Sequence, residues 1–148
     1  MTSLDREVVR RKLAHIAEAL EALRPLARLS FPEYAANLYQ RKAAERLLQV
    51  AIEAAVDVNT HILVGLGRPV PMDAYGSFVG LGDAGVLEGA LATRLAPSAG
   101  LRNRLVHEYN GLDDVKIHGA LAEALDGFAE FVAQVERFLE GSSPRMTS

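Results

Sequence analysis

The longest stretch of uninterrupted helical pattern lies between residues 33 and 66 and reads EYAANLYQRKAAERLLQVAIEAAVDVNTHILVGL. It contains no proline, and its first glycine is Gly65. Apolar residues recur along it at the three- and four-residue spacing that places them on one face of an α-helix. The stretch predicts one long helix, with Asn37 as the point where it could break.

Residues with special backbone preferences mark both ends of this helix. Before it, Ser30 and Glu33 have the Ser-x-x-Glu spacing of a capping box, with Pro32 in the first turn. After it, residues 65–71 read GLGRPVP, in which glycines favour a C-cap and the two prolines cannot continue a helix. This Gly-x-Gly has neither a strand before it nor a helix directly after it, so we interpret it as a helix stop and not as a phosphate-binding loop.

The flanking sequence predicts further helices. A stripe of apolar residues covers residues 4–23, with Pro25 after it and a loop through Arg28 and Leu29. Towards the C-terminus, Asp73 and Asp113 are placed to cap helices, and Gly82–Gly85 has the composition of a turn. These signals predict helices over residues 73–81, 86–95, 98–110 and 113–139.

No stretch alternates apolar and polar residues over a convincing length, so the chain is predicted to be all-α. We expect a helical bundle with two long helices and shorter connecting helices. A chain of 148 residues suits one domain, placed here at residues 1–140, with residues 141–148 as a disordered tail. The absence of cysteine and of an apolar leader or membrane span makes the cytoplasm the expected location.

The charge balance excludes a strong general attraction to nucleic acid, because the chain has 16 Lys and Arg residues but 19 Asp and Glu residues. Any contact with nucleic acid must therefore come from a local patch. One candidate patch consists of Arg94, Arg102, Arg104, His107, Lys116 and His118. Acidic residues are interspersed with it, so a solvated surface of mixed charge remains the alternative.

Residues 102–109, RNRLVHEY, bring cations, an amide, an imidazole and a phenol within about two helical turns. Metal-free cleavage of a phosphodiester needs a group that moves a proton and a cation that stabilises the transition state. His107 and Arg102 are our candidates for these roles. In RNA the 2′-hydroxyl is the nucleophile. One histidine is awkward for this reaction, because the attacking hydroxyl must lose a proton while the leaving oxygen gains one. A symmetric dimer would supply a second copy.

Each of these residues also has a structural interpretation. Arg102 and Arg104 could pair with the nearby acids Glu108, Asp113 or Asp114, Tyr109 could pack against the bundle, and His107 and Asn103 could be ordinary solvated side chains. The other histidines, His15, His61 and His118, lack the spacing of metal ligands, and we expect His118 to face solvent. The residues predict neither a metal site nor a cofactor, and on their own they leave catalysis open.

The spacing Arg102-Asn103-x3-His107-x-Tyr109 resembles the Arg-x4-His-x-Tyr motif of HepT-like toxins, a branch of the HEPN helical superfamily. The segment from Glu45 to Asp57 is similar to the long helix of that family. The resemblance extends over residues 4–139 and includes Phe78, Gly85-Val86, Leu91–Leu95 and Asp113.

The resemblance implies an all-α homodimer that acts on RNA as a metal-independent endoribonuclease in a toxin–antitoxin system. It implies that Arg102 and His107 are catalytic, and that Asn103, with Arg104 beside it, supports the site. Tyr109 would be modified with AMP by the partner, a minimal nucleotidyltransferase antitoxin of the MntA type. The alternative is a non-catalytic dimer that binds nucleotide or phosphate and serves as a scaffold for a nucleotidyltransferase.

Overall fold

The computed structural model describes residues 4–107 and 112–141, and all regular elements in that part of the chain are α-helices. The predicted fold class is therefore confirmed. The helices are α1 (Arg6–Ala27), α2 (Phe31–Ala36), α3 (Leu38–Gly65), α4 (Ala74–Asp83), α5 (Gly89–Leu95), α6 (Ser98–His107) and α7 (Asp114–Gly141). The two longest, α3 and α7, have 28 residues each, and α1 has 22.

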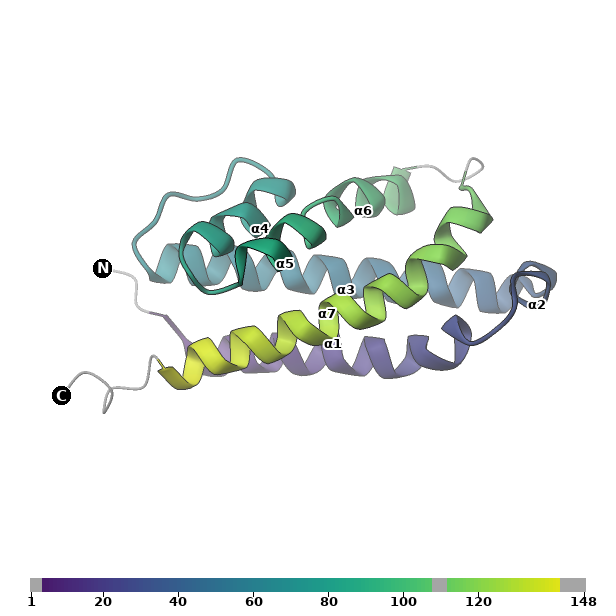
Figure 1. Ribbon diagram of the computed structural model, residues 1–148, viewed down its shortest axis with the longest axis horizontal. Coiled ribbons are helices and arrows are strands. Elements are labelled where there is room, and N and C mark those ends of the chain that lie inside the picture. Colours follow the sequence, from purple (N-terminus) through teal and green to yellow (C-terminus); the bar gives the residue numbers. More distant parts are fainter. Residues whose placement is uncertain (1–3, 108–111, 142–148) are drawn as a thin grey trace.

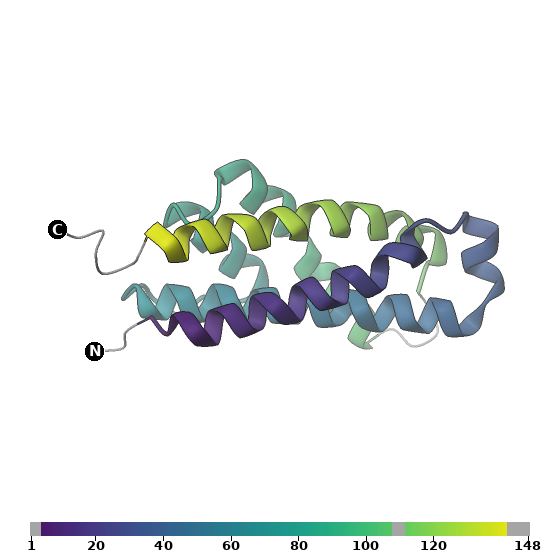
Figure 2. The same cartoon turned by 90° about the horizontal axis from the view of Figure 1, so that it is seen from below.

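Three long helices and one chain of short helices form a bundle (Figure 1). Helices α1, α3 and α7 run along its length, while α4, α5 and α6 follow one another on the side of α3 and α7 that lies opposite α1 (Figures 1 and 2). Helix α1 begins and α7 ends at the same end of the bundle. Helix α3 contacts α1, α4, α6 and α7, so it connects the short helices to the long ones.

The core is built from the apolar stripes that the sequence predicts. Val9, Leu13, Ile16 and Leu23 of α1 are buried against the alanine-rich face of α3. At the other side of the core, the rings of Phe78, Phe128 and Phe131 lie edge to face with centroids 6.1–6.4 Å apart. Such aromatic packing favours a fixed orientation of α4 on α7.

By length and composition alone, α3 is apolar enough to cross a membrane. Its apolar residues are nevertheless those of the bundle core, among them Leu48, Ile52, Val58 and Ile62, which are fully buried. Since α3 packs against α1, α2, α4, α6 and α7, burial inside the bundle accounts for its composition.

The break at Asn37 is confirmed, and the residue serves two helices. Asn37 is the C-cap of α2 and the N-cap of α3, where its side-chain Oδ1 accepts a hydrogen bond from the Gln40 amide at 3.0 Å. The capping box before α2 is also present. The Ser30 amide donates to the Glu33 carboxylate at 2.9 Å, and this bond is the main cause that lowers the pKa of Glu33.

Two predicted boundaries are wrong. Helix α1 does not stop before Pro25 but continues to Ala27 with the exposed proline inside it. The proline removes one backbone donor from the helix, and the Arg28 amide closes the last turn by donating to the Pro25 carbonyl at 3.3 Å. Helix α5 begins at Gly89 and not at Val86, because Val86 is buried in the turn that follows Gly85, whose φ is 78°.

The remaining predicted boundaries that fall on described residues agree with the structure to within two residues. Asp73 caps α4 by accepting the Gly76 amide at 2.7 Å, and α3 is followed by Gly67 with φ of 75°. Helix α7 extends to Gly141, one residue beyond the predicted domain limit, and the predicted tail from residue 142 lies outside the described residues. The prediction of a single domain over residues 1–140 stays a prediction.

Candidate functional site

Helix α6 carries the predicted motif on the surface of the bundle. The helix starts at Ser98, whose hydroxyl donates to the Leu95 carbonyl, and its partly buried Leu101 and Leu105 pack against the core. Contacts of α6 with α3 and α4 fix its position. The apolar residues thus face inward, while polar residues of the motif are left at the surface.

Arg102 reaches across to α3 and pairs with Glu53. Its Nε and Nη2 atoms both lie 3.1 Å from Glu53 Oε2, and its Nη1 donates to Asn103 Oδ1 at 3.2 Å. The side chains of Arg102 and Glu53 are 36% and 35% exposed, so the pair is open to solvent along one side. The guanidinium is therefore held in one orientation yet remains accessible to a ligand.

Glu53 is the residue that sequence reasoning missed. The candidate acids from the sequence were Glu108, Asp113 and Asp114, but the acid that pairs with Arg102 precedes it by 49 residues. Gln49, one turn earlier on α3, donates to the same Glu53 oxygen at 3.5 Å. The only sequence signal is a glutamate set among apolar residues of α3, and no spacing rule connects it to Arg102.

The other described polar residues of the motif, Asn103, Arg104 and His107, are exposed. His107 is the last described residue of α6. Within residues 4–107 and 112–141, neither a side-chain hydrogen bond nor an ion pair joins Arg104 or His107 to another residue. Tyr109, and the predicted helix end at Asn110 and Gly111, lie outside the described residues.

The six-residue patch predicted from the sequence is only partly assembled. Arg94 Nη2 pairs with Asp126 Oδ2 of α7 at 2.6 Å, away from the motif. His118 is not solvent-facing as predicted, because its Nε2 lies 2.7 Å from the Leu29 carbonyl oxygen and its ring lies against Phe31 and Tyr34. The basic side chains left for a ligand are those of Arg102, Arg104 and His107, with Lys116 exposed at the start of α7.

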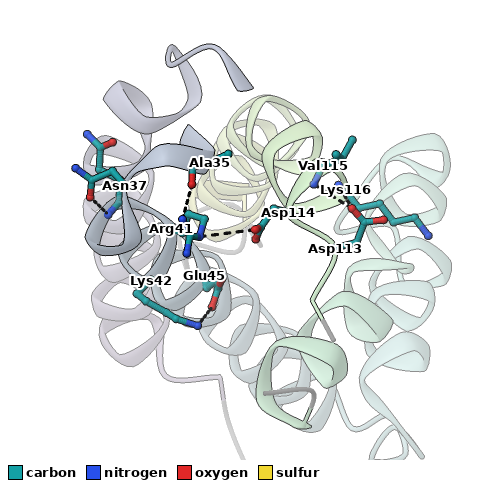
Figure 3. A network of polar contacts seen from close by, with 10 residues as sticks. Ala35, Asn37, Arg41, Lys42, Glu45, Asp113, Asp114, Val115 and Lys116 are labelled. Atoms are coloured by element: carbon teal, nitrogen blue, oxygen red, sulfur yellow. Dashed lines mark hydrogen bonds and ion pairs between the residues drawn. The ribbon is translucent and has the colours of Figure 1, made fainter. Parts of the chain in front are cut away.

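The start of α7 is anchored to α3 as well (Figure 3). Asp113 Oδ1 accepts the backbone amides of Val115 and Lys116 at 3.0 and 3.3 Å, which confirms the predicted cap. Arg41 of α3 lies 3.7 Å from Asp114 through its Nε atom. The two ends of the described chain that flank residues 108–111 are thus both tied to α3, one through Glu53 and one through Arg41.

The described residues bring no three His, Asp or Glu side chains together in the manner of a metal site, and the chain has no cysteine. What the site offers chemically is a positioned guanidinium, an exposed imidazole five residues later on the same helix, and an amide beside the guanidinium. These groups can bind an anion and move a proton.

Comparison with known proteins connects this arrangement to a family, since the model of the family described as Ribonuclease HepT-like matches residues 16–135. The chain belongs to this family. A relative named tRNA nuclease HepT, from Aphanizomenon flos-aquae (strain 2012/KM1/D3), is 34% identical over 139 residues, which cover 94% of this chain and 95% of the relative.

Solved structures share the HepT-like fold. The tri-AMPylated HEPN toxin of Shewanella oneidensis, in complex with MNT antitoxin, has a TM-score of 0.80 at 21% identity. The match covers 88% of this chain and 97% of the toxin chain. The cytosolic protein YutE of Bacillus subtilis has a TM-score of 0.82 at 17% identity. The match covers 95% of this chain and 94% of the YutE chain. At these identities the likeness establishes the fold.

Proposed function

We propose that this HepT-like protein is a metal-independent endoribonuclease and the toxin of a toxin–antitoxin pair. The observation that carries the proposal is that α6 presents an oriented, accessible Arg102 and, one and a half turns later, an exposed His107. Membership of a ribonuclease family and a relative named as a tRNA nuclease support the choice of RNA as substrate.

The proposed reaction is a transesterification within the RNA. The 2′-hydroxyl oxygen attacks the adjacent phosphorus and loses its proton to a base, and the bond from phosphorus to the 5′-oxygen of the next nucleotide breaks. That oxygen takes a proton from an acid, which leaves a 2′,3′-cyclic phosphate and a free 5′-hydroxyl. His107 transfers protons, Arg102 stabilises the negative charge of the transition state, and Asn103 and Arg104 support phosphate binding.

A homodimer completes the site in this proposal. Each motif provides one histidine, but the reaction needs one group to remove a proton and one to donate it. A two-fold axis near α6 would bring two copies of the motif together, because the same surface patch meets itself across such an axis. Arg102 and His107 are exposed enough to take part in such a shared cleft.

Regulation by AMP is the second part of the proposal. The partner, a nucleotidyltransferase of the MntA type, would transfer AMP from ATP to Tyr109, whose hydroxyl oxygen attacks the α-phosphorus and releases pyrophosphate. The AMPylated state of the Shewanella oneidensis toxin supports this chemistry. An added phosphate beside Arg102 and His107 would compete with RNA for the same cations. We place the protein in the cytoplasm, where YutE is also found.

RNA cleavage in the presence of EDTA tests the catalytic proposal. Arg102→Ala and His107→Ala should each lower cleavage by about 100-fold or more, as loss of a proton-transfer or charge-stabilising group does. Arg24→Ala and His61→Gln, which alter residues of the same types away from α6, are the matched controls. Equal cleavage by all variants would contradict the roles of Arg102 and His107. RNA left equally intact by the wild type and both variants, with each still folded as a dimer, would leave the non-catalytic scaffold as the better function.

Co-expression with a nucleotidyltransferase partner tests the regulatory proposal. Wild-type protein should gain the mass of one or more AMP groups, and Tyr109→Phe should gain none. An unchanged wild-type mass in the presence of an active partner would contradict modification at Tyr109.

A further inference from the structure

A groove between α1 and α3 lies next to the motif. It has a volume of about 420 Å³ and is lined by Val8, Arg11, Lys12, His15, Arg46, Val50, Glu53, Ala54 and Asp57. Helices α1 and α3 run side by side along the bundle, as Figure 2 shows, so the groove follows the direction of two long helices. Neither the motif nor the predicted patch includes its basic residues.

The charges in the groove are mainly positive and only partly neutralised. Lys12 lies 3.6 Å from Asp57, and the Glu53 carboxylate is occupied by Arg102. Arg11, His15 and Arg46 remain exposed, and none of them forms an ion pair within the described residues. The carboxylates of Asp57 and Glu53 are thus both in ion pairs. Two arginines and an imidazole that line the groove are not.

The groove and the motif are continuous through one side chain. Glu53 lines the groove, and the same carboxylate holds Arg102 of α6. On α3, Arg46 lies seven residues before Glu53, which is about two helical turns. On α1, Arg11 and His15 are one turn apart and share a face. A flexible polyanion bound at Arg102 could therefore continue along Glu53 into the groove and meet these cations in succession.

We propose that Arg11, His15 and Arg46 bind the sugar–phosphate backbone of the RNA substrate on one side of the scissile bond. This inference rests on the proposed ribonuclease function and deepens it by assigning a substrate-binding track. Contacts of this kind position a nucleic acid without reading its sequence. They also explain how a chain with a net charge of −3 can hold RNA, since a local groove supplies what the overall charge does not.

Salt-dependent binding tests the groove directly. The probe is a fluorescent single-stranded RNA, and the protein is the full chain carrying His107→Ala so that the RNA stays intact. Adding Arg11→Gln and Arg46→Gln together should weaken binding at low salt by about tenfold or more, and should reduce the slope of log K against log salt by about 1.4, or 0.7 for each lost phosphate contact. The matched control combines Arg24→Gln and Arg137→Gln, two exposed arginines outside the groove.

Cleavage by the otherwise wild-type chain separates the two proposals. The groove substitutions should raise KM by about tenfold with kcat much less affected, because they remove binding and leave α6 unchanged. If the wild type cleaves RNA and the groove variant matches the control in KM and salt slope, the groove proposal alone is overturned. If the wild type neither binds nor cleaves RNA, both proposals fail. Loss of binding to a partner protein, with RNA binding unchanged, would also overturn the groove proposal.

Discussion

Glu53 lies between the motif and the groove, and its negative charge has opposite effects on the two. Its carboxylate orients the Arg102 guanidinium, but it also places a negative charge beside a groove that we propose binds phosphate. The ion pair is about one-third exposed, so it adds at most about 1 kcal/mol to the free energy of unfolding. Its value to the protein must therefore lie in positioning Arg102.

We predict that Glu53→Ala lowers kcat for RNA cleavage by roughly tenfold, because a guanidinium without its partner samples several orientations. KM should stay the same or fall, since a negative charge is lost beside the groove. Steady-state kinetics will separate these effects. The control is Glu21→Ala, which removes an exposed glutamate paired with Arg24 on α1. A rise in KM at constant kcat would contradict the positioning role.

Tyr34 gives a pH-dependent prediction. The side chain is buried, its hydroxyl has no hydrogen-bond partner among the described residues, and burial, with the Glu45 and Asp114 carboxylates, raises its pKa from 10.0 to about 12. The ionised form is thus favoured in the unfolded chain. Stability from this group is complete below pH 10 and is lost as the pH rises towards 12.

Urea unfolding between pH 8 and pH 12 will therefore show a steeper loss of stability in the wild type than in Tyr34→Phe. Below pH 10 the variant should match the wild type or exceed it by up to about 1 kcal/mol, because an unpaired buried hydroxyl is removed. Parallel curves for the two proteins over the whole range would contradict the raised pKa.

For individual residues, the sequence identifies the members of the motif but not the residues that contact them. Arg102 and His107 could be recognised by type and spacing, because both lie on one short helix. Glu53 and the inward-facing His118 could not, since their partners are distant in sequence: Arg102 is 49 residues away and Leu29 is 89 residues away. Such pairings arise from packing between helices, which local patterns do not encode.

Among the helix junctions, the one at Asn37 matters most for the fold. It ends α2 and starts α3, the helix to which both sides of the motif segment are tied. Local patterns located this junction, the capping box and the Asp73 and Asp113 caps, because capping depends on residues within one turn. They failed at Pro25 and at the start of α5, where burial of neighbouring residues decides how far the helix extends.

We predict that Asn37→Ala lowers the free energy of unfolding by about 1 kcal/mol, the usual effect of losing an N-cap side chain. Asn37→Asp should retain most of the stability, because its carboxylate can accept the same bond from the Gln40 amide. Chemical denaturation of the three proteins measures both effects. An Ala variant as stable as the wild type would show that packing alone fixes the α2–α3 junction.

For the whole molecule, the proposed chemistry requires more than one chain. We predict a species of twice the 16.0 kDa chain mass in analytical ultracentrifugation at micromolar concentration. Substitution of the motif residues Arg102 and His107 should leave that mass unchanged if they serve catalysis and not assembly. A wild-type protein that stays monomeric at these concentrations would remove the second histidine and with it the proposed proton transfers.

The placement of the chain ends has a practical consequence. Helix α1 begins and α7 ends at one end of the bundle, whereas α6 finishes and α7 starts towards the other (Figure 1). Arg102 of the motif nevertheless pairs with Glu53, which lies 12 residues, about 18 Å, along α3 from Gly65, and Gly65 lies beside Leu4 at the end where α1 begins. A reporter or affinity domain is therefore better fused after α7 than before α1, because Val8 and Arg11 near the start of α1 line the groove proposed for RNA.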